Sequence, residues 1–166
     1  MSTLTTPRDL FLHELGDILY VEQKLADEVL PKLVGEVQDA ELRKGFERHL
    51  DQTKGHVTNV EQVFDALGEK PEPEECIGFQ GLKKEHDQLL DEASSDLVDL
   101  VDSGAAARTE HYEIAAYETL IAMARSLGEK EAVGLLEENL KEEKEALREV
   151  ESRAKALMKE SAKAAS

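Results

Sequence analysis

The feature that most constrains this 166-residue chain is a set of long apolar stripes with helical spacing. Apolar residues recur at alternating steps of three and four over stretches of about 25–30 residues, and such positions lie on one side of an α-helix. The repeat is close to 3.5 residues, which suits long helices that pack at shallow angles. We predict four long helices, at about 7–34, 40–67, 97–127 and 130–159.

The segments between the stripes predict how these helices connect. Pro31 should end or kink the first helix, since proline lacks the N–H that a helix interior needs. The turns near 35–38 and at Gly128 are short, so the helices that they join should be antiparallel neighbours. The long segment between the second and third helices holds a shorter helix at about 79–93. We therefore predict an all-α fold: one domain over 1–166, an antiparallel four-helix bundle with an additional short helix in the crossover.

Composition excludes several partners. The formal net charge of −17 makes nucleic acid and anionic membranes poor partners. No apolar run approaches the ~18 residues of a membrane helix, and the first residues lack the apolar core of a signal peptide. The lone Cys76 rules out an internal disulfide and fits a reducing compartment. We expect a cytoplasmic protein.

Three of the four stripes are each interrupted by one glutamate: Glu22, Glu110 and Glu143. The fourth stripe carries His49 and His56. Glu22 and His56 are 34 positions apart and Glu110 and Glu143 are 33 apart, so the two halves of the chain should place these residues at similar depth. A carboxylate on an apolar seam is costly to bury unless something neutralises it.

Carboxylates and imidazole from four facing helices are the means by which bundle proteins hold two iron or manganese ions. Glu113, one turn after Glu110, and Gln52, one turn before His56, could join them. The predicted centre holds one or two ions of Fe or Mn, and the predicted ligands are Glu22, His56, Glu110, Glu113, Glu143 and Gln52.

Other polar residues on these helices have plainer interpretations. We expect His49 to be a hydrogen-bonded histidine of the core or its rim, His86 and His111 to be structural, and Glu142 to lie on a solvated face. Tyr112 and Tyr117 could donate hydrogen bonds to the metal ligands, but packing in the core is the default interpretation. Two glycines inside the second helix, Gly45 and Gly55, would be explained by the close approach of a neighbouring helix.

Several segments together resemble the YciE/YciF family of bacterial and archaeal ferritin-like proteins, over about residues 5–157. The most specific is Glu110-His111-Tyr112-Glu113-Ile114-Ala115; the others are Thr6-Pro7-Arg8-Asp9-Leu10-Phe11, Glu22-Gln23-Lys24-Leu25, Pro31-Lys32-Leu33, His49-Leu50, Thr53-Lys54-Gly55 and Leu140-Lys141-Glu142-Glu143-Lys144. The resemblance implies a ferritin-like bundle, a homodimer, a link to stress responses and a metal site.

The chain departs from the wider ferritin-like pattern, in which two helices each carry Glu-x-x-His. Here one helix has Thr53 in place of the Glu before His56, and the other has Ala146 in place of the His after Glu143. Two standard ligands are missing, which argues against tight two-metal binding and ferroxidase chemistry unless Glu113 and Gln52 compensate.

Three functions stay open on these observations. The first is a non-haem iron or manganese protein that handles metal or consumes oxidants. The second is a metal-free helical dimer that acts through protein contacts, with its acids sharing protons with histidine. The third is an oxidoreductase of peroxidase or catalase type at a dinuclear centre. Metal content separates the first from the second.

Overall fold

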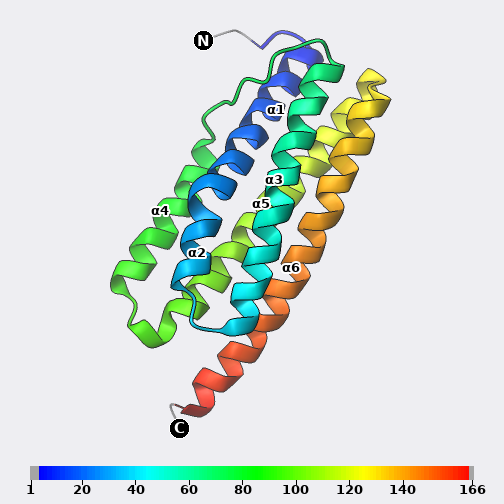
Figure 1. The fold of residues 1–166 in the computed structure, drawn as a ribbon. Coiled ribbons are helices and arrows are strands. Elements are labelled where there is room, and N and C mark those ends of the chain that lie inside the picture. The colour runs from blue at the N-terminus through cyan, green and yellow to red at the C-terminus, as the bar shows by residue number, and fades with distance from the viewer. Residues whose placement is uncertain (1–3, 165–166) are drawn as a thin grey trace.

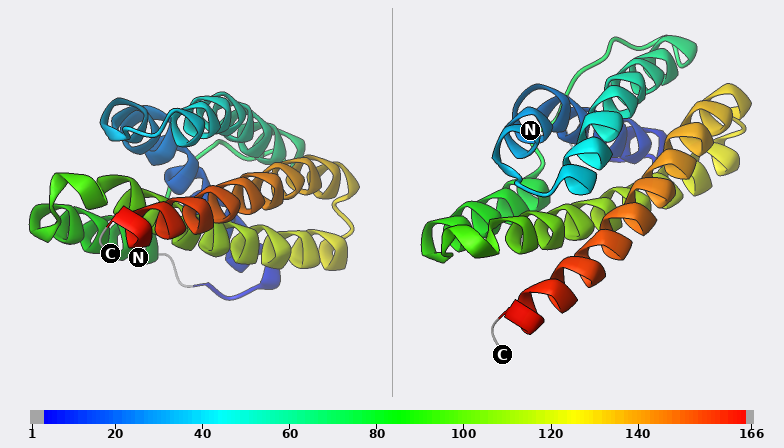
Figure 2. Two further views of the ribbon diagram at one scale, coloured as in Figure 1. Left: turned by 90° about the horizontal axis from the view of Figure 1, so that it is seen from below. Right: turned by 60° about the horizontal axis from the view of Figure 1, so that its bottom comes forward.

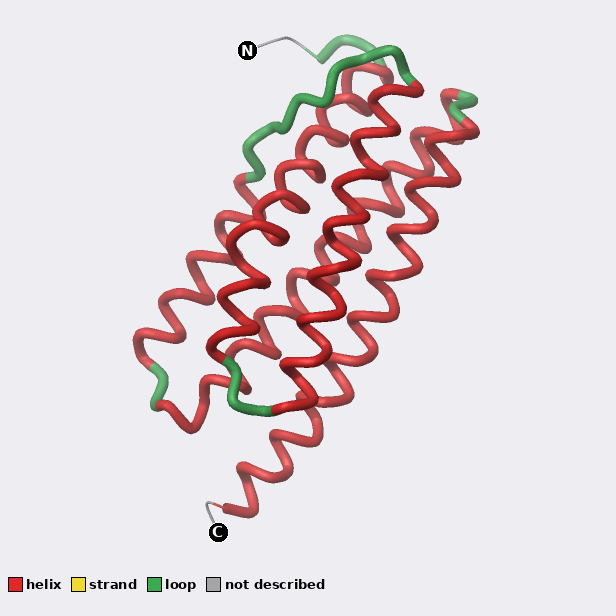
Figure 3. The backbone as a smooth tube through the Cα atoms, in the orientation of Figure 1, coloured by secondary structure: helices red, strands yellow, loops and turns green. Residues whose placement is uncertain are grey.

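The computed structural model describes residues 4–164, and all regular structure within them is helical (Figure 3). Four long helical rods run antiparallel, and a shorter helix lies outside them in the crossover (Figure 1). The predicted ferritin-like four-helix bundle with an additional short helix is confirmed. In chain order the elements are α1 (Pro7–Lys24), η1 (Leu25–Val29), α2 (Leu30–Glu36), α3 (Ala40–Ala66), α4 (Ile77–Glu92), η2 (Ser95–Leu97), α5 (Val98–Leu127) and α6 (Lys130–Ala164).

The first rod begins with a capping box and contains a π-helical turn. The Asp9 N–H donates to Thr6 Oγ1 at 3.1 Å, and the Thr6 N–H donates to Asp9 Oδ2 at 2.9 Å. Farther along, Pro31 kinks the rod without ending it. The π-helical turn η1 directly precedes this region, and the Leu30 N–H donates to Leu25 O. This wider turn accommodates Pro31, which has no N–H to donate.

Both tight helix ends use glycine in the left-handed region. Gly128 has φ +80° between α5 and α6, and Gly68 has φ +73° after α3. The α3 helix starts at Asp39, whose carboxylate accepts from the Leu42 N–H at 2.8 Å and also pairs with Arg153 of α6. These caps fix the heights at which the helices face one another.

The crossover loop is held against α1 at Gly16. The Glu74 N–H donates to Gly16 O at 2.9 Å, and a Cβ on Gly16 would lie 2.6 Å from Glu72 O. Only a residue without a side chain allows the two backbones to approach so closely. The loop then leads into α4, which packs beside α5.

The last helix is longer than predicted. We expected it to end near residue 159 and the chain to fray from Ser161, but α6 continues to Ala164. The added residues are mainly Ala, Lys and Glu, whose high intrinsic propensity sustains a helix without packing. Figure 2 shows this end of α6 projecting past the other helices. Residues 165–166 of the expected tail lie outside the described residues.

The core follows the predicted stripes, from Phe11 and Leu15 on α1 to Leu136 and Val150 on α6. The two glycines of α3 are not explained by a neighbouring helix of the same chain. A Cβ at Gly45 or Gly55 would meet no atom within 4 Å, so the expected close approach is wrong within one chain. Among residues 4–164, no helix is at once long and apolar enough to cross a membrane.

Candidate metal centre

The polar centre of the bundle consists of six buried side chains from all four rods. α1 contributes Glu22 from its last turn, directly before the π-helical turn; α3 contributes two histidines, α5 two glutamates and α6 one. Each is at most 5 % exposed: Glu22, His49, His56, Glu110, Glu113 and Glu143. The 3.5-residue stripes place five of these side chains inward because each occupies a seam position, and Glu113 lies one helical turn after Glu110.

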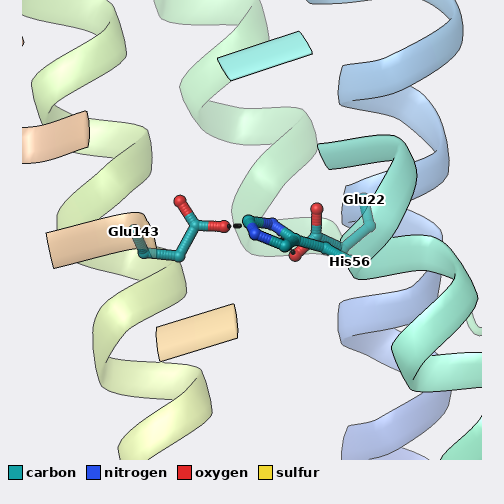
Figure 4. A group of neighbouring side chains, drawn as sticks. All are labelled: Glu22, His56 and Glu143. Atoms are coloured by element: carbon teal, nitrogen blue, oxygen red, sulfur yellow. Dashed lines mark ion pairs between the residues drawn. The ribbon is translucent and has the colours of Figure 1, made fainter. Parts of the chain in front are cut away.

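His56 connects α1 and α6 at the inner side of the cluster. Its Nδ1 lies 2.8 Å from Glu143 Oε1 and 3.4 Å from Glu22 Oε1 (Figure 4). Its Nε2 lies 2.9 Å from Glu142 Oε2, whose side chain is 32 % exposed. The expectation that Glu142 belongs to a solvated face is therefore wrong. Its side chain is long enough to reach across to the imidazole on α3.

His49 makes a second set of contacts on the outer side. Its Nε2 lies 3.1 Å from Glu110 Oε1 and 3.6 Å from Glu143 Oε2. Two trios of buried ligand atoms thus share one carboxylate: Glu22, His56 and Glu143 form the inner trio, and His49, Glu110 and Glu143 form the outer trio. Within each trio the atoms lie within 4.8 Å of one another.

The structure does not place every predicted ligand in these trios. Glu113 is fully buried beside them without belonging to either. Gln52 is half-buried and makes no hydrogen bond to the cluster among the described residues. Thr53, which stands where the wider pattern has glutamate, donates its hydroxyl to His49 O at 2.8 Å and so is satisfied by the backbone.

A hydrogen-bonded chain supports the inner trio on the side that faces the turn between α5 and α6. Tyr117 donates its hydroxyl to Glu22 Oε1, Asn139 Nδ2 donates to Tyr117 Oη at 3.0 Å, and Asn59 Nδ2 donates to Asn139 Oδ1 at 2.7 Å. Tyr117 thus takes the donor role that the sequence left open beside core packing, whereas Asn139 was not singled out. The available signal was spacing, since Asn139 precedes Glu143 by one helical turn and shares its face.

Burial changes the protonation of these groups. Loss of hydration raises the pKa of both Glu110 and Glu143 to about 7. Burial also raises the pKa of Glu113 well above its usual value, and the charges of Glu143 and Glu22 add to this effect. For His56, burial lowers the pKa, but the charge of Glu22 and the bond to Glu143 outweigh burial and raise the pKa to about 11.

Buried polar atoms without a hydrogen-bond partner indicate whether a cation fits this cluster. Ten buried side-chain nitrogen and oxygen atoms of the described residues have no hydrogen-bond partner, and all but Asp102 Oδ2 belong to the six cluster residues. Four buried carboxylates lie beside two imidazoles, so when all four are ionised, as bound ligands are, two negative charges remain even with both imidazoles protonated. Oxygen and imidazole nitrogen donors in this ratio suit divalent iron and manganese.

The fold and this centre define a ferritin-like helical-bundle protein with a buried carboxylate and histidine cluster. Residues 6–163 match the model of a domain of unknown function, DUF892. The chain belongs to this family. It is 34 % identical to protein YciF of Escherichia coli strain K12 over 143 residues, which cover 85 % of this chain and 86 % of that protein. The resemblance to the YciE/YciF family of ferritin-like proteins is thereby confirmed.

Solved structures agree with the sequence relationship. The crystal structure of the E. coli stress protein YciF matches with a TM-score of 0.87 at 31 % identity, covering 94 % of this chain and 99 % of that chain. YcfI of Rhodopseudomonas palustris matches with a TM-score of 0.86 at 39 % identity, covering 89 % and 94 %. A protein of Xanthomonas campestris shares the fold, with a TM-score of 0.75 at 21 % identity over 92 % and 94 %.

Proposed function

We propose that this protein binds iron or manganese at the buried cluster and contributes to metal handling or oxidant defence under stress. The observation that carries the proposal is the set of nine buried nitrogen and oxygen atoms on these six side chains that have no hydrogen-bond partner. When ionised, the four carboxylates carry more negative charge than the two imidazoles can neutralise. Burying bare carboxylates costs several kcal/mol each. A divalent ion would offset this cost.

The residues divide into ligands and supporting groups. Glu22, His56, Glu110, Glu143 and His49 would hold one or two ions, with Glu143 shared between two positions, and Glu113 would add a further carboxylate. Glu142 would accept the Nε2–H of His56 and leave Nδ1 free to bind, which is how carboxylates commonly orient metal-binding histidines. Bound iron or manganese supplies redox chemistry toward oxidants. The apolar walls of the bundle exclude bulk water from it.

The relatives and the composition support the cellular setting of this proposal. One similar structure is described as a stress protein. The single Cys76 is buried and free, as in proteins of a reducing cytoplasm. We also propose that two copies associate as a homodimer, since Gly55 of α3, which lies outside the groove lining, has open space beside it that no helix of the same chain fills.

The test compares wild type with Glu110→Ala, each with and without Fe²⁺ or Mn²⁺. We expect stoichiometric metal in wild type and stabilisation by about 2.7 kcal/mol at a free metal concentration of one hundred times Kd. Glu110→Ala should lose both metal and this stabilisation. Without metal, the same change removes a source of repulsion and should be neutral or stabilising.

The control for this test is Glu138→Ala, because Glu138 is exposed on α6 and lies outside the cluster. This variant should bind metal as wild type does. Elemental analysis and thermal melting are the two measurements. If metal-replete wild type carries no stoichiometric ion and its melting ignores added metal, the metal-free dimer becomes the better function.

A further inference from the structure

An open groove of about 740 Å³ runs between α3 and α6 and reaches the buried cluster. Phe46 and Gly45 lie along its α3 wall, and Ala146 and Val150 lie along its α6 wall. Two cluster residues, His49 and Glu110, also line it. The groove therefore joins the surface to the outer trio.

The exposed fractions of the cluster residues also indicate that solvent reaches the cluster from the groove. His49 is 4 % exposed and Glu110 is 5 % exposed, whereas His56 is 1 % exposed and Glu22 and Glu143 are fully buried. Both residues that retain contact with solvent line the groove. Among the described residues of the cluster, the approach from solvent is thus at the outer trio.

Ala146 keeps this approach open. It lies one turn after Glu143 on α6, on the wall of the groove, where the wider ferritin-like pattern has a histidine. A larger side chain there would project into the passage. Farther out, Arg48 of α3 pairs with Glu149 of α6, and both line the groove. Both side chains are 53 % exposed, so this ion pair is weak and breaks readily through thermal motion.

Four acids and four basic residues line the groove, so its charges are balanced. Three of its basic residues are each paired with an acid: Lys44 with Glu41, Arg48 with Glu149, and Arg153 with Asp39. The net charge of −17 of the whole chain attracts divalent cations from solution. The carboxylate of Glu110 on the floor of the groove would receive them.

We propose that the α3–α6 groove is the entry route for divalent cations, and that Ala146 is the residue that keeps it passable. An ion on this route reaches His49 and Glu110 before it reaches the inner trio. The inference rests on the proposed metal function of the cluster. The proposal adds the path by which the ion enters and the residue, Ala146, that keeps this path open, and neither follows from the ligands alone.

The experiment places a removable plug in the groove. Ala146→Cys is labelled with a bulky methanethiosulfonate reagent, and the uptake of Co²⁺ by the metal-free protein is followed by stopped-flow absorbance. We expect the labelled protein to bind Co²⁺ roughly tenfold more slowly or worse, because obstruction acts on the association rate. Reduction of the mixed disulfide should restore the original rate, and the final occupancy should be unchanged.

Two controls accompany the plug. Ala122→Cys, on an exposed position of α5 outside the groove, should take up Co²⁺ at the same rate with and without label. Wild type treated with the reagent should also be unaffected, because Cys76 is fully buried. If Ala146→Cys fails to fold, Gly45→Cys on the opposite wall replaces it, since its Cβ meets no atom within 4 Å.

The outcomes separate the two proposals. Co²⁺ binding at equal rates in labelled and reduced protein overturns the entry route and leaves the metal function standing. An absence of Co²⁺ binding in wild type overturns both. Slow uptake that reduction reverses, together with unchanged uptake in the labelled Ala122→Cys control, supports the groove as the route.

Discussion

Glu143 is the residue on which both halves of the cluster depend. Its two carboxylate oxygens point to different histidines, Oε1 toward His56 and Oε2 toward His49. Loss of hydration and the charge of Glu110 raise its pKa to about 7. In the metal-free protein this carboxyl group therefore exchanges its proton near neutral pH, far from the range of an exposed glutamate.

The first prediction concerns the pH dependence of the metal-free protein. The pKa values of Glu110 and Glu143 are raised from 4.5 to about 7 on folding, so the native state binds more protons than the unfolded state in this window. Stability from these groups is full below pH 4.5 and is lost as pH rises through 7. We expect on the order of 1–3 kcal/mol for each group.

Urea unfolding at intervals between pH 5 and 8 measures this slope. Glu143→Gln should flatten it, because glutamine has no proton to lose. Glu138→Gln, at an exposed position of the same helix, should keep the wild-type slope and so corrects for general repulsion among surface acids. Equal slopes in wild type and Glu143→Gln would contradict the prediction. His56, whose pKa is raised to about 11, loses its contribution only at higher pH.

The spacing of residues in the sequence predicts that some of these side chains point inward, but it does not predict the contacts of others. Glu22, Glu110 and Glu143 interrupt apolar stripes, so periodicity alone directs them inward. His49 also lies on a stripe, but its partners come from α5 and α6. The spacing within one helix does not predict which residues of two other helices will contact it. Glu142 reaches His56 through side-chain length, which periodicity ignores.

Among the elements, the crossover and α4 depend on close contact with the first rod. Gly16 allows the loop to cross α1, and Gln80 of α4 donates to the Tyr20 hydroxyl of α1 at 3.2 Å. The two prolines of the loop, Pro71 and Pro73, predict a break in helix but not the path that the loop takes. That path depends on a contact between residues far apart in sequence.

The second prediction tests this contact. Gly16→Ala places a Cβ 2.6 Å from Glu72 O, so the loop must shift away from α1. We expect a loss of about 1–3 kcal/mol in the free energy of unfolding. Gly134→Ala is the matched comparison, since its Cβ meets no atom within 4 Å and it lies on the exposed side of α6. There we expect a gain of about 0.5–1 kcal/mol. Destabilisation of both variants to the same degree would contradict the argument.

At the scale of the whole molecule, the number, order and direction of the helices followed from the stripes and the turns. The end of the last helix did not, because intrinsic propensity extends α6 to Ala164. The π-helical turn before Pro31 is a local feature that the stripes do not predict. Association between copies also lies beyond one chain's periodicity. The open space beside Gly55 is the feature that motivates a second copy.

The third prediction is that the protein sediments as a homodimer. The chain mass is 18.4 kDa, so a species of about twice this mass is expected at micromolar concentration. Gly55 is exposed in the single chain, and the second copy is proposed to pack against it. Gly55→Leu should therefore shift the equilibrium toward monomer, because the larger side chain obstructs this contact. Sedimentation velocity distinguishes the species, and a clean 18.4 kDa monomer for wild type would contradict the prediction.

The division of the cluster between the two halves of the chain has a consequence for synthesis. The N-terminal hairpin supplies Glu22, His49 and His56, while Glu110 and Glu143 come from the C-terminal hairpin. Domains form as the chain emerges from the ribosome, N-terminal parts first. Glu143 belongs to both trios and lies on the last helix, so neither trio is complete until α6 has been made. Under the proposed metal function, a nascent chain therefore exposes no complete set of ligands, and ion binding can begin only after α6 has packed into the bundle.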